Sequence, residues 1–78
     1  MATRLDLRNW IIEALQALGG RGTPIEVSRV IWERHEADLR RSGNLFYDWQ
    51  YQLRWAATAL RAEGTLKKTR GDRTWELS

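Results

Sequence analysis

The sequence has no cysteine and only one histidine, His35. Disulfide bonds and thiolate metal sites are therefore excluded, and a single imidazole cannot form a multi-histidine metal site. No apolar run approaches the roughly 18 residues that a membrane-spanning helix requires. Residues 1–10 also lack the apolar core of a signal peptide. We therefore expect a cytoplasmic protein with no metal, no small-molecule cofactor and no membrane partner.

The residue patterns of common catalytic sites are also missing. The chain contains no cysteine nucleophile, no Ser–His–acid pattern and no glycine-rich phosphate loop. Glu36 and Asp38 are close to His35 in sequence, but helical spacing points them to other sides of a helix. We expect His35 to lie at the border of the core, in a protein that is not an enzyme.

The 78 residues are rich in tryptophan and carry a net positive charge. Five tryptophans are present, together with a net charge of +3 and a sequence pI of about 10.0. A chain of this length forms a single domain, residues 1–78, whose thin core depends on large side chains. A local excess of basic residues at such a pI favours a polyanionic partner. An ordinary solvated surface is the alternative.

The first predicted helix covers residues 6–18. It is predicted from apolar residues three and four positions apart, which are Leu7, Ile11, Ala14, Leu15 and Leu18. Asp6 is a plausible N-cap. Gly19 and Gly20 are expected to end the helix, because glycine adopts the left-handed conformation at little steric cost.

The second predicted helix covers residues 24 to about 38. Thr23 is a favourable N-cap, Pro24 suits the first helical position, and Glu26 has the capping-box spacing from Thr23. The apolar side of this helix consists of Val27, Val30 and Ile31, with Trp32 at its border. The glycine-containing segment that follows interrupts the pattern.

The third predicted helix covers residues 46 to 63 and ends at Gly64. Either Ser42 or Asn44 is expected to cap its start. Its buried side is predicted to contain Phe46, Trp49, Leu53, Ala56, Ala57 and Leu60. Its exposed side is predicted to carry polar, aromatic and cationic residues, which are Tyr47, Gln50, Tyr51, Arg54, Thr58 and Arg61.

A two-stranded hairpin is predicted at residues 65–77. Leu66, Trp75 and Leu77 alternate toward one side, and the tip is cationic, with Lys67, Lys68, Arg70 and Arg73. Residues 21–23 are a possible third strand. Three helices followed by a hairpin are the element order of a winged helix-turn-helix, a mostly helical α+β fold.

Several short motifs are shared with a known family. They are Trp55-Ala56, Leu60, Glu63-Gly64, Arg70-Gly71 and Trp75-Glu76-Leu77-Ser78, with residues 10–20 and 23–27 fitting the same pattern. In these motifs the chain resembles the N-terminal winged-helix domain of Mrr-type restriction endonucleases. That resemblance implies a domain that places a separate nuclease domain on DNA. It implies DNA binding and not cleavage, because these 78 residues include no nuclease domain.

The winged-helix arrangement predicts which residues contact double-stranded DNA. Helix 46–63 would enter the major groove, where Arg54 can pair with guanine and Gln50 with adenine. The predicted contacts are Tyr47, Gln50, Tyr51, Arg54, Thr58, Arg61, Lys67, Lys68, Arg70 and Arg73. Backbone contacts are also possible at Arg21 and Arg29, and more weakly at Arg40 and Arg41. Such a protein could be a small transcription regulator, a nucleoid-associated protein or the targeting part of a restriction system.

The alternative function is a protein–protein interaction or homodimerisation module. Trp55 lies nearly opposite Leu60 on the third helix, where it would form an exposed apolar feature. We expect it to pack within the molecule, against helix 24–38 or the hairpin; a homodimer contact is the alternative. Tyr47 and Tyr51 are equally compatible with DNA contact and with covering the core edge or a dimer interface.

Overall fold

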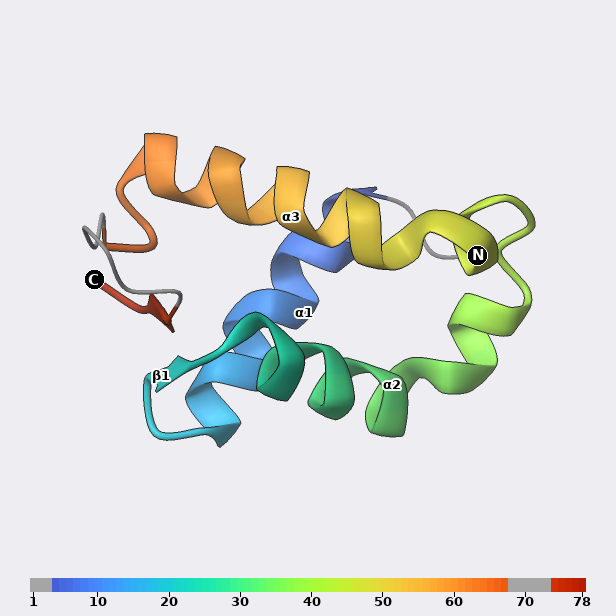
Figure 1. Cartoon of the computed structure of the whole chain (residues 1–78), viewed down its shortest axis with the longest axis horizontal. Coiled ribbons are helices and arrows are strands. Elements are labelled where there is room, and N and C mark those ends of the chain that lie inside the picture. Colours follow the sequence, from blue (N-terminus) through green and yellow to red (C-terminus); the bar gives the residue numbers. More distant parts are fainter. Residues whose placement is uncertain (1–3, 68–73) are drawn as a thin grey trace.

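The computed structural model describes residues 4–67 and 74–78 (Figure 1). Within these ranges the chain forms a small, mostly helical α+β fold, compatible with a winged helix. Its elements are α1 (Arg4–Ala17), β1 (Arg21–Gly22), α2 (Pro24–Arg40), α3 (Leu45–Glu63) and β2 (Trp75–Glu76). The three predicted helices are thus confirmed, and each end lies within two residues of its predicted position.

The start of α1 differs from the prediction, whereas its end agrees with it. The helix begins at Arg4, so Asp6 lies in its first turn and is not the N-cap. A carboxylate there still interacts favourably with the positive end of the helix dipole. After the helix, Gly19 and Gly20 have φ angles of 85° and 101°, which glycine adopts readily. The predicted glycine stop is confirmed.

The capping box predicted at the start of α2 is present. The Thr23 N–H donates to the Glu26 carboxylate (2.9 Å), and the Thr23 hydroxyl accepts from the Glu26 N–H (3.1 Å). The hydrogen bond from the Thr23 N–H to the carboxylate, followed by the interaction of the carboxylate with the Thr23 side chain, holds the pKa of Glu26 below its ordinary value of 4.5. A short local sequence therefore fixes where α2 begins.

The start of α3 is not capped by the side chain of Asn44, one of the two predicted caps. Asn44 occupies the N-cap position, but its side chain makes no capping hydrogen bond. The backbone N–H groups of Leu45 and Phe46 bond instead to the carbonyls of Ser42 and Gly43, at 3.2 and 3.1 Å. The Ser42 hydroxyl donates to the Asp38 carbonyl and so interacts with the end of α2.

The end of α3 agrees with the prediction. Gly64 has a φ of 85°, and its N–H bonds to carbonyls of the last helical turn. This left-handed C-cap turns the chain from α3 into the segment that leads to β2.

The strands form a small antiparallel sheet next to the helices. β1 pairs with β2, with Arg21 opposite Glu76 and Gly22 opposite Trp75. The possible third strand at residues 21–23 is present at Arg21–Gly22, where it is one of the two strands of the described residues. The two arms of the predicted hairpin also meet, through a bridge between Leu66 and Leu77 and a Lys67 N–H to Glu76 carbonyl hydrogen bond of 2.8 Å. The predicted tip, with Lys68, Arg70 and Arg73, lies outside the described residues.

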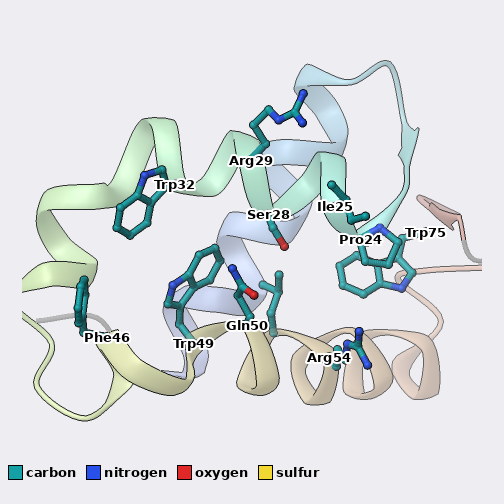
Figure 2. Close-up of a pocket in the computed structure, with 11 residues that line it drawn as sticks. Pro24, Ile25, Ser28, Arg29, Trp32, Phe46, Trp49, Gln50, Arg54 and Trp75 are labelled. Carbon is teal, nitrogen blue, oxygen red and sulfur yellow. The ribbon is translucent and has the colours of Figure 1, made fainter.

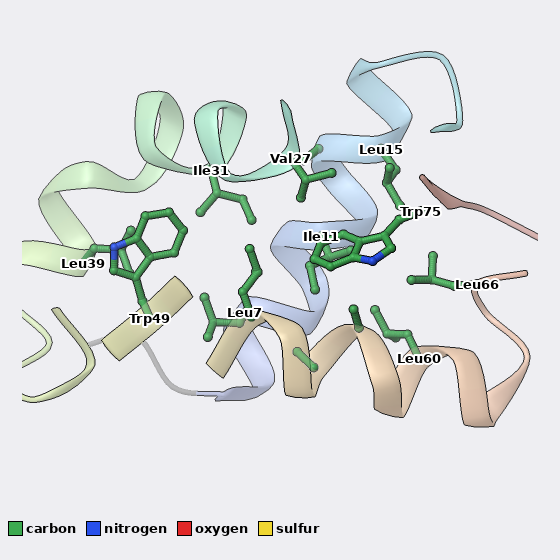
Figure 3. Close-up of a cluster of buried hydrophobic side chains, with 14 residues drawn as sticks. Leu7, Ile11, Leu15, Val27, Ile31, Leu39, Trp49, Leu60, Leu66 and Trp75 are labelled. Carbon is green, nitrogen blue, oxygen red and sulfur yellow. The ribbon is translucent and has the colours of Figure 1, made fainter. Parts of the chain in front are cut away.

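One hydrophobic core joins the three helices to the sheet (Figure 3). Leu7, Ile11 and Leu15 of α1 pack between side chains of α2 and α3. The predicted inner side of α3 is buried at Trp49, Leu53, Ala56, Ala57 and Leu60, while Phe46 is only half-buried. Trp75 and Leu66 close the core beside the sheet. Within the described ranges, no helix combines the length and the apolar character needed to cross a membrane.

The capping box generates a prediction about pH. Folding lowers the pKa of Glu26. The ionised carboxylate therefore stabilises the native state at every pH above the pKa of the unfolded chain, and this stabilisation is lost as the pH falls through the pKa of the folded state. We expect Glu26→Gln to lower the free energy of unfolding at pH 7, and the difference to vanish in acid. Urea denaturation between pH 3 and 7, followed by tryptophan fluorescence, measures this. Glu33→Gln, an exposed position on the same helix, is the control; an equal effect there would contradict the capping explanation.

Candidate functional site

The side of α3 that faces away from the core carries the residues predicted to contact a partner. We call this the outer face of α3; its members are Tyr47, Gln50, Tyr51, Arg54, Thr58 and Arg61. Five of them are exposed and Arg61 is half-buried. The predicted exposure of this face is confirmed, because the buried residues of α3 occupy the other side of the helix.

No acid of the described residues neutralises the arginines of this outer face. Neither Arg54 nor Arg61 has a carboxylate of residues 4–67 or 74–78 within 4.0 Å. Most ion pairs lie elsewhere: Arg8 with Glu63, Arg34 with Glu13, and Arg40 with Glu36. Asp48, in the first turn of α3, accepts a hydrogen bond from Gln52 (3.2 Å). Uncompensated cations on one face raise the local positive potential.

Among the predicted contacts that the structure describes, Thr58 and Lys67 already have a bonding partner. The Thr58 hydroxyl donates to the Arg54 carbonyl (3.0 Å), so its proton is used within the helix. The Lys67 ammonium lies 3.8 Å from the Glu76 carboxylate. A solvent-exposed pair at that distance is weak, so Lys67 retains most of its attraction for an anion. Thr58 can still act as an acceptor.

The arginines predicted as backbone contacts have different surroundings. Arg21 is exposed on β1 and makes no ion pair with a described carboxylate. Arg29 is exposed on α2, where its charge contributes to the low pKa of Glu26. Arg40 pairs with Glu36 at 2.8 Å, and its guanidinium lies 5.4 Å from the centre of the Trp32 ring. Arg40 is therefore held by intramolecular contacts, unlike Arg21.

A groove lies between α2 and α3 and ends at Trp75 (Figure 2). Its volume is about 550 Å³, and it brings together Gln50, Arg54 and Arg29. Its apolar lining includes Ile25, Trp32, Phe46, Trp49, Leu53 and Trp75. The sequence analysis did not predict this groove, since it depends on the tertiary packing of three separate segments.

Trp55 does not pack as expected. Its side chain is 53% exposed, and its ring contact is with Tyr51, edge to face at 6.4 Å between ring centres. The expectation that it packs on α2 or the hairpin is therefore wrong. Tyr47 and Tyr51 are also exposed, at 85% and 61%. Because these three residues lie four positions apart, they form a continuous row along α3, which we call the aromatic row.

His35 lies at the border of the core, as expected, with 18% of its side chain exposed. Its ring stacks on Trp10, with 4.0 Å between ring centres. Its Nε2 is 3.4 Å from the Glu13 carboxylate, and its Nδ1 is 4.0 Å from Asp38. The expectation that Asp38 points elsewhere is thus wrong. In the part of the chain that the structure describes, no three potential ligands gather to hold a metal ion.

Comparison with known proteins gave no match to any protein-family model, curated protein sequence or solved structure. The resemblance to the N-terminal domain of Mrr-type endonucleases therefore stays a prediction.

The contrast between Trp49 and Trp55 can be tested by substitution. Trp49→Ala removes a buried ring from the core and is expected to cost about 3–5 kcal/mol of the free energy of unfolding. Trp55→Ala removes a half-exposed ring and is expected to cost about 1 kcal/mol or less. Chemical denaturation followed by circular dichroism measures both. A large loss at Trp55 would show that its ring packs within the molecule after all.

Proposed function

We propose that this protein is a winged-helix domain that binds double-stranded DNA without catalysis. In this proposal α3 enters the major groove and the segment at residues 65–77 lies along the phosphate backbone. The observation that carries the proposal is the pair of arginines on the outer face of α3, Arg54 and Arg61, which no described acid neutralises. The major groove is wide enough to admit an α-helix.

Base contacts would come from the middle of α3. Gln50 and Arg54 are one helical turn apart and both exposed. Arginine pairs with the O6 and N7 atoms of guanine, and glutamine with the N6 and N7 atoms of adenine. These two side chains are therefore the proposed source of sequence preference. The aromatic row would pack on sugars or on thymine methyl groups beside them.

Phosphate contacts would come from the cations around α3. Arg61 continues the outer face toward the C-terminal end of the helix, and Lys67 follows on the arm that pairs with β2. Arg21 and Arg29 are exposed on β1 and α2. Long cationic side chains of this kind fix the position of a protein on the duplex without reading bases. Lys68, Arg70 and Arg73 are proposed to act in the same way.

The proposed role is that of a regulator or a DNA-targeting module in the cytoplasm, associated with the nucleoid. The resemblance to the Mrr-type N-terminal domain supports the targeting role. A single module with so few contacts would bind weakly, and a homodimer or a fused domain would raise its effective concentration on DNA.

The proposal predicts salt-dependent binding to a duplex of arbitrary sequence. Fluorescence anisotropy at several salt concentrations should give a straight line of log K against log salt concentration. Arg54→Gln should weaken binding, and Arg61→Gln should reduce the magnitude of the slope by about 1, the value for one lost phosphate contact. Arg34→Gln is the charge-matched control, because Arg34 is already paired with Glu13. It should change neither quantity.

Two outcomes would contradict the proposal. One is the absence of binding at low salt, where electrostatic association is strongest. The other is an equal loss of affinity for Arg34→Gln and Arg54→Gln, which would show that net charge and not the outer face governs binding.

The aromatic row favours a second candidate function, a protein–protein interaction or dimerisation module. Trp55, Tyr51 and Tyr47 are all exposed. Tyrosine and tryptophan are enriched at the energetically important positions of protein interfaces. A row of three on one helix is an apolar feature that a monomer has no structural need to expose.

This second function predicts concentration-dependent self-association. Sedimentation velocity across a hundredfold concentration range should show a dimer if the aromatic row is a homodimer interface, and Trp55→Ala with Tyr51→Ala should restore the monomer. The control is Ile25→Ala, which removes an exposed apolar side chain of α2 and should leave the dimer intact. A monomer at every concentration would exclude homodimerisation through this row.

A further inference from the structure

The groove between α2 and α3 has a chemical character that contact with DNA does not explain. Most of its lining is apolar, with Trp49, Leu53 and Trp75 at its base and Ile25 exposed by 72% on one rim. Apart from single thymine methyl groups and sugars, DNA presents charged phosphates and polar base edges to a helix in the major groove. An exposed apolar hollow beside such a helix would remain unfilled.

The groove has the dimensions of a small-ligand site. On α2 its lining runs from Pro24 to Trp32, and on α3 from Phe46 to Arg54. Eight residues of helix span about 12 Å. The volume of about 550 Å³ lies within the range of roughly 300–1,000 Å³ that is typical of ligand pockets. One compact molecule with an aromatic ring would fit this space.

One end of the groove is held in place by aromatic contacts. The ring of Trp32 is nearly parallel to that of Trp49, at 10° with 6.1 Å between ring centres, and lies 6.4 Å from the ring of Phe46. The guanidinium of Arg40 lies 5.4 Å from the Trp32 ring centre. These contacts link α2 to α3. This end of the groove is therefore already formed before a ligand binds. A pre-formed wall lowers the entropic cost of binding.

The polar groups of the groove select for negative charge. Gln50 points into it from α3 and Ser28 from α2 (Figure 2), and Arg54 of α3 is also part of the lining. Arg29 lies on the rim. Among the described residues that line the groove there is no aspartate or glutamate, and no described carboxylate pairs with Arg54. A ligand anion would therefore meet a guanidinium without displacing an existing ion pair.

We propose that the groove binds a small aromatic carboxylate. The ring would lie on Leu53 between Trp49 and Trp75, and the carboxylate would accept hydrogen bonds from Arg54 and the Gln50 amide. A guanidinium binds a carboxylate through two parallel N–H bonds, which fixes both the position and the direction of the ligand. The apolar ring supplies most of the buried area, and the anion supplies the specificity.

Occupation of this site would affect the proposed function of α3. Arg54 belongs both to the groove and to the outer face that is proposed to contact DNA. A carboxylate bound to Arg54 would neutralise it, so ligand and DNA would each weaken the binding of the other by the same factor. This competition rests on the proposed DNA binding, whereas the ligand site itself does not.

Three probes separate the ring from the charge. The probes are 2-naphthoate, 2-naphthalenemethanol and acetate, each titrated into the full chain without DNA and followed by amide chemical shifts in ¹H–¹⁵N NMR spectra. We expect 2-naphthoate to bind at least about tenfold more tightly than either of the others, since a hydrogen bond to a charged group contributes about one order of magnitude or more. The shifts should gather at Ser28, Gln50 and Arg54. Equal affinity of the acid and the alcohol would overturn the proposal.

Substitutions then assign the anion contact. Arg54→Gln should reduce the affinity for 2-naphthoate to that of the neutral alcohol. The matched control is Arg61→Gln, which removes the same charge from α3 but outside the groove lining, and it should have no effect. If both substitutions reduce the affinity for 2-naphthoate equally, the net positive charge of the protein attracts the anion, and the proposed contact with Arg54 is contradicted.

The same titrations separate this inference from the proposed function. Naphthoate binding without any duplex binding would leave the ligand site intact and remove the DNA proposal. Duplex binding without naphthoate binding would support the DNA proposal and overturn the ligand site. When both occur, saturating naphthoate should raise the Kd for the duplex in the natural chain. Equal duplex affinity with and without naphthoate would overturn the competition.

Discussion

The burial of one side of α3 against α1 determines the direction of every other side chain on that helix. Leu53 and Leu60 reach the core formed with Leu7 and Ile11, and the small Ala57 lets the neighbouring elements approach closely. An α-helix has 3.6 residues per turn, so the direction of each side chain depends on its position in the sequence. Because Leu53, Ala57 and Leu60 face the core, the cations and the aromatic row must lie on the outer face. A change in this packing would rotate both proposed surfaces at once.

The same packing gives the outer face its charge. Where α1 meets α3, Arg8 of α1 is paired with Glu63. Where α1 meets α2, Arg34 is paired with Glu13. Arg54 and Arg61, which face away from these contacts, have no described carboxylate within 4.0 Å. The two interhelical pairs are themselves solvent-exposed, and they leave the unpaired positive charge of α3 on its outer face, which supports an anionic partner.

Local signals in the sequence predicted most of the fold. Thr23 and Glu26 form their capping box from four consecutive residues, and Gly64 ends α3 because its own φ is left-handed. The start of α3 was predicted to within one residue, but its cap was not, since backbone carbonyls accept the hydrogen bonds expected of the Asn44 side chain. For Trp55, helical spacing alone indicated exposure; the wrong expectation came from assigning a partner to an apolar side chain. Prediction from local patterns thus succeeds where the determining contacts are themselves local.

The groove illustrates what such patterns cannot predict. Its apolar base includes Trp49 and Trp75, which are far apart in the sequence and line the same groove only because β2 pairs with β1 beside α2. Gln50 and Arg54 could be assigned to the exposed side of a helix from their spacing. Their position on the wall of a cavity required the placement of α2. Sites of this kind depend on tertiary structure even when each contributing helix is predicted correctly.

The most direct test of the central claim is to map where a DNA duplex touches the molecule. ¹H–¹⁵N NMR spectra recorded during titration with a short duplex at low salt report each backbone amide separately. The account predicts that the largest shifts occur along the outer face of α3, at Gln50, Arg54 and Arg61, and continue to Lys67. Shifts confined to the opposite side of the molecule, around Asn9 and Glu13 of α1, would contradict it, as would unchanged spectra.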